Sequence, residues 1–157
     1  MSDVSAAPWI VFGSSVRGAS HKRAGLPNQD AIHANPRIDV APGIATAEPP
    51  LILAISDGHG SPRSFRSDTG ALTAAQIGVE RTREFIDHFQ SENLAREVIR
   101  DITRNRLPAE IVRSWKKEVR DHLTQNPFTE EELRRLIRDA GFTPKQRDTL
   151  YRTYFLN

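Results

Sequence analysis

The strongest constraint on the fold is an apolar run, LILAIS at residues 51–56, which ends abruptly in Asp57-Gly58-His59-Gly60. Consecutive apolar residues over this length are typical of a β-strand that is buried on both faces. The run therefore predicts a strand at the centre of a packed sandwich. The two glycines predict a sharp turn after that strand, because glycine adopts backbone conformations that other residues avoid.

The rest of the first half also has the pattern of strands and loops. WIVFGSSV at residues 9–16 predicts a strand, since it is rich in β-branched and aromatic residues. DAIHANPRIDV at residues 30–40 is a weaker candidate that Pro36 interrupts. APGIATAEPP at residues 41–50 has the proline and glycine content of a loop.

Helical periodicity replaces this pattern near Asp68. A first helix, which Ser67 or Asp68 would cap, is predicted from an apolar face. That face consists of Leu72, Ala75, Val79, Ile86 and Phe89. A second apolar stripe consists of Leu94, Val98 and Ile102.

Three further helices have sequence signals at their ends. Pro108 suits the first turn of a helix whose apolar positions are Ile111, Trp115, Val119 and Leu123. TEEELRRLI begins with a capping box between Thr129 and Glu132, and Gly141 is expected to end that helix. Thr143 and Pro144 then predict the start of another helix.

Composition excludes several classes of protein. The 22 Lys and Arg residues nearly balance 20 Asp and Glu residues, which does not favour a nucleic-acid partner. Cysteine is absent, so disulfides and thiolate metal sites are excluded. We find neither an apolar stretch that could span a membrane nor a basic secretory leader, and we expect a cytoplasmic protein.

The acid at the end of the apolar run has two interpretations. Ser-Asp-Gly-His-Gly could be a polar turn, because Asp-Gly is a common turn dipeptide. Alternatively, Asp57 and the carbonyl of Gly58 could bind a cation, since carboxylates and carbonyls are the ligands that Mg²⁺ and Mn²⁺ prefer. Histidine is the most frequent general acid in enzymes, so His59 could then donate a proton to a leaving group.

A second stretch favours the cation site. SSVRGASHKRAGLPNQDAI at residues 14–32 places another acid, Asp30, after a loop that holds glycine and proline. The same stretch contains His21 and three cationic side chains, Arg17, Lys22 and Arg23. Two acids on adjacent β elements with cations nearby suit a metal-dependent phosphate site, in which a cation holds the phosphate.

These segments resemble a known family, the metal-dependent protein phosphatases of the PPM type, also called protein phosphatase 2C. SVRGASH at residues 15–21 with GLPNQDA at residues 25–31 is similar to the first motif of a prokaryotic branch. ISDGHGS at residues 55–61 is similar to the second motif, and SFRSDTGALTAA at residues 64–75 to the start of the first long helix. The resemblance implies an α+β fold, here part of an αββα sandwich.

The resemblance also implies a function and roles for individual residues. Asp30 would help to hold one metal ion, Asp57 would bridge two, and Gly58 would contribute its carbonyl. The cofactors would be Mg²⁺ or Mn²⁺, with two ions in the complete site. A metal-activated water would attack phosphoserine or phosphothreonine in a protein substrate, and His59 would be the general acid.

Two positions depart from the family pattern. Gln29 stands where many relatives have an acid, which leaves one negative charge fewer for the metals. Gly25 stands where the family usually has its phosphate-binding arginine, so Arg17, Lys22 or Arg23 would have to substitute. For His21, a helper role near the site and a structural hydrogen bond both remain open.

The resemblance covers the N-terminal portion of such a phosphatase, so we expect a truncated domain. Residues 8–93 would form that portion, and residues 94–157 a charged helical segment that is either the family's elongated second helix or a divergent tail. A protein partner or a second chain could complete the fold. The main alternative function is an inactive pseudophosphatase or regulatory binding module, and a helical nucleic-acid binder is a weaker one.

Overall fold

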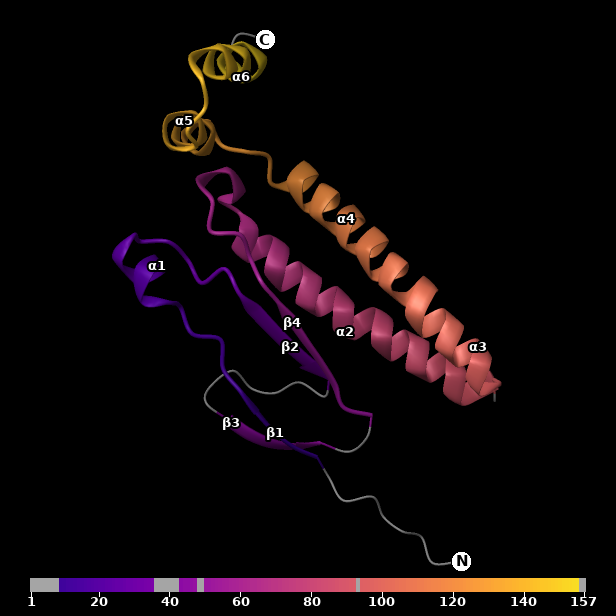
Figure 1. Cartoon of the computed structure of the whole chain (residues 1–157). Helices are drawn as coiled ribbons and strands as arrows, with labels where there is room; N and C mark the ends of the chain where they lie inside the picture. The colour runs from indigo at the N-terminus through magenta and orange to yellow at the C-terminus, as the bar shows by residue number, and fades with distance from the viewer. Residues whose placement is uncertain (1–8, 36–42, 48–49, 93, 156–157) are drawn as a thin grey trace, which may run out of the picture.

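The structure is a computed structural model that describes residues 9–35, 43–47, 50–92 and 94–155, with strands first and long helices after them (Figure 1). The strands are β1 (Trp9–Gly13), β2 (Ala31–Asn35), β3 (Gly43–Ala47) and β4 (Ile52–Ser56). The helices are α1 (Ala19–Arg23), α2 (Ser67–Glu92), α3 (Arg96–Asp101), α4 (Leu107–Gln125), α5 (Glu130–Asp139) and α6 (Pro144–Phe155). Two short turns complete the set, the 3-10 turn η1 (Pro62–Ser64) and the π-helical turn η2 (Ile102–Arg106). This mixture confirms the predicted α+β class.

The strands form two antiparallel pairs, β1 with β3 and β2 with β4. The pairing of β3 corrects the prediction of a loop at residues 41–50. Proline and glycine stand only at the ends of that segment, and its interior pairs with β1, with Val11 opposite Ala45. Pairing with β1, which is distant in sequence, provides hydrogen-bond partners for the backbone of residues 43–47, although the local sequence is not typical of a strand. Residues 41–42 and 48–49 of the predicted loop lie outside the described residues.

The β2–β4 pair packs against α2 through small side chains. Ala31 and Ala54 from the strands meet Ala71 and Ala75 from the helix, and Ala75 is only 1% exposed. Small residues let the helix approach the sheet closely: a Cβ built at Gly78 would lie 3.5 Å from the Cβ of Ala54. Figure 1 shows α2 running beside β2 and β4 along their length.

The opposite face of the β2–β4 pair is open along β4, which corrects the expectation that residues 51–56 are buried on both faces. On the β2 side of this face Ala34 is buried, and Ile32 lies next to Gly13 of β1. Side chains alternate along a strand, so Leu53 and Ile55 point away from the face that Ala54 shares with α2. Leu53 is 58% exposed and Ile55 is 83% exposed. The prediction of a strand is confirmed, but among the described elements α2 covers only one of its faces.

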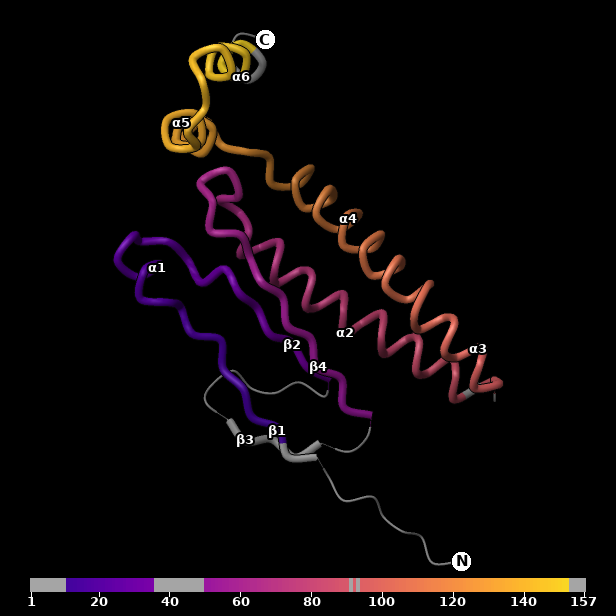
Figure 2. Tube along the Cα trace, in the orientation of Figure 1, coloured from indigo at the N-terminus to yellow at the C-terminus, as the bar shows by residue number. Residues whose placement is uncertain are grey.

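On its other side α2 packs against α4, and the two helices run side by side (Figure 2). The indole Nε1 of Trp115 donates a hydrogen bond to the carbonyl of Gly70 at 3.0 Å and ties the two helices together. Two predicted details of α2 are wrong. Leu72 is 47% exposed, because the buried face is centred on Ala71 and Ala75. Ser67 is the first residue of the helix, and its hydroxyl donates to the carbonyl of His59 instead of capping.

Local signals predicted the later helix ends correctly. Pro108 lies in the first turn of α4, and Pro144 begins α6. The capping box of α5 is present: Thr129 Oγ1 accepts from the N–H of Glu132 at 3.2 Å, and Glu132 Oε2 accepts from the N–H of Thr129 at 2.8 Å. Gly141 follows α5 with φ of 65°, a left-handed conformation that suits glycine after a helix end. In the described part of the chain, we find no helix with the length and apolarity needed to cross a membrane.

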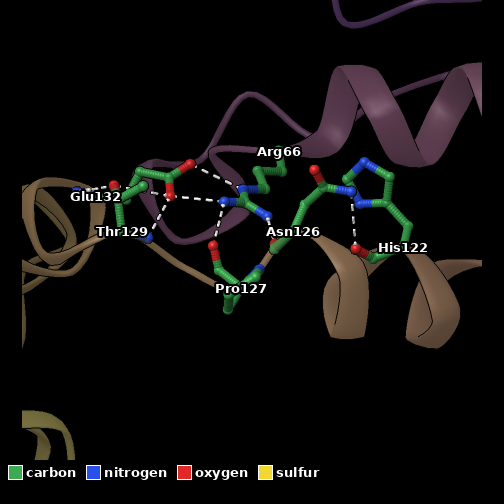
Figure 3. A network of polar contacts seen from close by, with 6 residues as sticks. All are labelled: Arg66, His122, Asn126, Pro127, Thr129 and Glu132. Carbon is green, nitrogen blue, oxygen red and sulfur yellow. Dashed lines mark hydrogen bonds and ion pairs between the residues drawn. The ribbon is translucent and has the colours of Figure 1, made fainter.

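Arg66 fastens α5 to the turn that precedes α2 (Figure 3). Its guanidinium donates from Nε and Nη2 to the two carboxylate oxygens of Glu132 at 2.8 and 2.6 Å. It also donates to the carbonyls of Asn126 at 2.6 Å and Pro127 at 3.1 Å, and it lies 4.9 Å from the centre of the Phe128 ring. Such a bidentate arrangement fixes both the distance and the orientation of the two partners. The start of α5 is therefore held against residues 126–128 and the η1 turn.

The same contacts control the charge of Glu132. The hydrogen bond from Arg66 lowers the pKa of Glu132 to about 2, and the bonds from Thr129 act in the same direction, while partial burial opposes them. A pKa below that of the unfolded chain means that the ionised form stabilises the fold. This contribution is complete above the unfolded pKa of about 4.5 and is lost as the pH falls toward about 2.

We expect Glu132→Gln to destabilise the chain by about 1–2 kcal/mol near pH 7, a figure that allows for solvent screening of a partly exposed pair. The difference from the unmodified chain should shrink as the pH falls below about 4.5, because the native carboxylate then begins to lose its advantage. Urea unfolding followed by tryptophan fluorescence over this pH range measures it. Glu131→Gln, an exposed neighbour in the same turn, is the matched control, and a pH-independent difference for Glu132→Gln would contradict the assignment.

Candidate active site

The two sequence motifs meet at one end of the β2–β4 pair. Asp30 directly precedes β2 and Asp57 directly follows β4, and the register places Ala31 opposite Ser56. The backbone N–H of Gly58 donates a hydrogen bond to Asp30 Oδ1 at 3.2 Å. The carboxylate of Asp30 therefore lies against the peptide that joins Asp57 to Gly58, and both acids are exposed there.

Gly58 is required at this junction by the closeness of the two backbones. A Cβ built at position 58 would lie 2.1 Å from the carbonyl oxygen of Gln29 and 2.9 Å from its carbonyl carbon. Real Cβ atoms do not come this close to backbone, so any larger residue would push the two loops apart. The glycine thus sets the separation between Asp30 and the Asp57–Gly58 peptide.

Polar side chains hold the loop before Asp30 in place. The hydroxyl of Ser15 donates to the carbonyl of Asp30 at 2.9 Å, and Asn28 Nδ2 donates to the hydroxyl of Ser15 at 2.6 Å. Gly25 turns the chain with φ of 66°, and the N–H of Leu26 donates to the carbonyl of His21 at 2.9 Å. Sequence analysis did not single out Ser15 and Asn28. The sequence feature that could have identified them is that both are short hydrogen-bonding side chains in or beside a loop with glycine and proline.

The backbone fixes the orientation of the His59 ring. Its Nδ1 accepts a hydrogen bond from the N–H of Ser61 at 3.1 Å, and the carbonyl of His59 accepts from the hydroxyl of Ser67 at 3.1 Å. Because Nδ1 is an acceptor, the neutral ring carries its proton on Nε2. The side chain is exposed, so its donor edge is available to a ligand.

His21 comes from α1 and lies next to the second motif. It is half-buried, and its Nε2 would be 3.6 Å from a Cβ built at Gly60. The structure therefore brings His21 and the Gly58-His59-Gly60 turn together, as the hypothesis of a helper residue requires.

The three candidate phosphate-binding cations surround the same loop. Arg17 is exposed, and its Nη1 donates to the carbonyl of Leu26 at 3.3 Å. Lys22 and Arg23 lie exposed in the last turn of α1. Arg17 thus contacts the loop that leads to Asp30, whereas Lys22 and Arg23 are close to that loop in sequence.

The oxygen atoms at the junction match the chemistry of a hard divalent cation, but their number is small. Asp30 and Asp57 contribute carboxylates and Gly58 contributes a carbonyl, which are the ligand types of Mg²⁺ and Mn²⁺. Across the described ranges, no three or more His, Cys, Asp or Glu side chains gather as a metal-binding group. The described residues therefore fit one side of such a site, and the remaining positions would be filled by water or by other ligands.

Comparison with known proteins agrees with the motifs. The family model for protein phosphatase 2C matches residues 17–143, which include the second motif, all but the first two residues of the first motif, and the helices α2 to α5. No curated protein and no solved structure matches the chain. The family match extends over most of the chain and contains every candidate metal-binding, catalytic and phosphate-binding residue. The chain therefore belongs to the protein phosphatase 2C family.

Proposed function

We propose that this chain forms part of a metal-dependent phosphatase that hydrolyses phosphoserine and phosphothreonine in proteins. Membership of the protein phosphatase 2C family supports the class of reaction. The single observation that carries the assignment to particular residues is the hydrogen bond from the Gly58 N–H to Asp30 Oδ1. It joins the two acidic motifs at one end of the sheet, where a divalent cation and a phosphate could be bound together.

In this proposal Asp30, Asp57 and the carbonyl of Gly58 would hold Mg²⁺ or Mn²⁺, with two ions in the complete site. The metal would supply Lewis-acid chemistry: it would polarise the phosphoryl oxygens and lower the pKa of the attacking water. His59 would donate its Nε2 proton to the leaving seryl or threonyl oxygen, since Nδ1 already accepts from Ser61.

The phosphate would be held by a cation near the Asp30 loop, for which Arg17, Lys22 and Arg23 are the candidates. Each could neutralise the charge that a phosphate monoester brings to a site with two acids. His21 would assist as a hydrogen-bonding neighbour of the Gly58-His59-Gly60 turn. We infer a cytoplasmic location from the cysteine-free composition.

A second candidate function is a pseudophosphatase or regulatory binding module. Two observations favour it: across the described ranges no three or more His, Cys, Asp or Glu side chains gather as a metal-binding group, and Leu53 and Ile55 expose an apolar part of the sheet. A protein partner or a second chain could cover that face. A binding module would also agree with the predicted domain boundary between residues 93 and 94, which separates the phosphatase-like part from a charged helical segment. The two parts are in contact, however, because Arg66 of the first binds Glu132 of α5 in the second.

We expect Asp57→Asn to lower Mn²⁺-dependent hydrolysis of an aryl phosphate by at least about 100-fold, because the variant loses a metal ligand and its charge. Initial rates with and without chelator measure the effect. Asp148→Asn, which removes an exposed acid of α6 that pairs with Arg152, is the control and should leave the rate unchanged. A folded chain that shows no metal-dependent rate at all would support the binding-module alternative.

We expect Gly58→Ala to destabilise the chain by more than about 2 kcal/mol or to distort the junction, since the new Cβ would overlap the Gln29 carbonyl. Gly70→Ala is the matched control. Position 70 is helical and open, with no atom outside its own helix backbone within 4 Å of the new Cβ, so alanine there should be neutral or slightly stabilising. Denaturant unfolding compares the two, and equal stabilities would show that the junction is looser than described.

A further inference from the structure

A cavity lies directly beside the candidate active site and is closed on one side by α5. Its volume is about 150 Å³, and its walls come from the loop at residues 25–29, the segment at residues 60–65 and one face of α5. Gln29 and Gly60 in these walls are the sequence neighbours of Asp30 and His59. Any group bound in the cavity would therefore sit next to the proposed reaction centre.

Gln29 gives this cavity an unsatisfied hydrogen-bond acceptor. The residue is 3% exposed, and its Oε1 is buried without a hydrogen-bond partner. Leaving such an atom unpaired costs free energy, because it has lost its hydrogen bonds to water. Oε1 lies beside the cavity wall formed by Gly60, where a Cβ would be only 3.5 Å away. Oε1 itself has almost no accessible surface, so a donor that enters along Gly60 pairs with it only after the Gln29 amide turns toward the cavity.

The rest of the cavity selects a neutral and partly apolar group. Its apolar walls are formed by Leu26, Pro27, Pro62, Phe65 and Leu136. The charged side chains in the wall are Arg135 and Asp139, and Arg135 Nε lies 3.8 Å from Asp139 Oδ2. Arg138 Nε forms a second ion pair with Asp139 Oδ1 at 2.9 Å. The acid is thus already compensated, so the cavity offers little to a free cation. A short apolar stem that ends in an N–H or O–H donor matches these walls.

The α5 wall is held in place before any ligand arrives. Arg66 binds Glu132 at the start of the helix, and Arg63 Nε donates to the carbonyl of Ala140 just after its end at 3.1 Å. The Arg63 guanidinium also lies 4.7 Å from the centre of the Phe142 ring. Fastening both ends of a short helix to the same turn reduces the ordering that a ligand would have to bring about.

We propose that this cavity is a subsite for a neutral, donor-ended side chain of the protein substrate, such as glutamine, that flanks the phosphorylated residue. The subsite rests on the proposed phosphatase function for its occupant, because its position beside Asp30 and His59 is what links it to a phosphoprotein. Gln29 Oε1 accepts the hydrogen bond, Leu136 and its apolar neighbours contact the stem, and α5 becomes part of the specificity-determining surface.

Two small probes test the cavity without requiring catalysis. Butanamide mimics a glutamine side chain, and methyl propyl ketone has the same shape with a methyl group in place of the amide NH₂. We expect butanamide to shift the backbone amide NMR signals of Gly60, Ser61 and Leu136 and to bind about five- to tenfold more tightly than the ketone, as one extra hydrogen bond would give. Equal binding of the two probes, or no shift with either, would overturn the subsite.

Variants of α5 locate the binding. Leu136→Trp fills the cavity and should abolish the butanamide shifts, whereas Glu131→Trp adds the same ring on an exposed position of the helix and should preserve them. Gln29→Leu should remove the preference for the amide. It should also raise the midpoint of urea unfolding in the free chain, because it replaces an unpaired buried acceptor with an apolar group. A lowered midpoint in a Gln29→Leu chain that keeps its preference for butanamide would contradict the role of Gln29.

A set of phosphoserine peptides then identifies the occupant. Each peptide carries one glutamine at one of the positions nearest the phosphoserine, against an all-alanine parent. At least one should bind about fivefold more tightly than the parent, and Leu136→Trp should erase that advantage. Identical binding of the whole set would reject a substrate side chain as the occupant. Because these are binding measurements, they can fail while aryl phosphate hydrolysis succeeds, or succeed while it fails, so the two proposals are tested separately.

Discussion

The close contact between the Gly58 backbone and the Gln29 carbonyl is the constraint on which the candidate site depends. It brings two loops, which lie at the same end of the β2–β4 pair, to a separation that no side chain larger than hydrogen would permit. The Gly58 N–H can then reach Asp30, so the two acidic motifs meet at one place.

The long helix α2 transmits this arrangement to the rest of the chain. Its small side chains pack on β2 and β4, its opposite side carries α4, and its first residue holds the carbonyl of His59. The turn before it carries Arg63 and Arg66, which hold α5 across the cavity beside the site. The helix α5, although distant in sequence, thus contributes to the surroundings of the proposed reaction centre. The opposite charges of Arg66 and Glu132 and the hydrogen bonds between them hold it there.

Features set by local chemistry could be predicted from the sequence, and features set by distant contacts could not. The Thr129–Glu132 capping box and the turn at Gly141 depend on neighbouring residues alone, and both were expected. The strand β3 depends on its pairing with β1, and the exposure of Leu53 and Ile55 depends on which layers surround the sheet. For the site, the motifs pointed to Asp30 and Asp57, but neither the buried Gln29 acceptor nor the Arg66–Glu132 pair, 66 residues apart, leaves a local pattern.

The central claim is that Asp30 and the Asp57–Gly58 turn form one side of a divalent cation site, and direct binding of Mn²⁺ tests it best. Electron paramagnetic resonance measures the free Mn²⁺ that remains as the ion is titrated into the chain. The account predicts weak, saturable binding, since few protein ligands are present, and a loss of that binding in both Asp30→Asn and Asp57→Asn. Binding that is unchanged in either variant, or no binding by the unmodified chain, would contradict it.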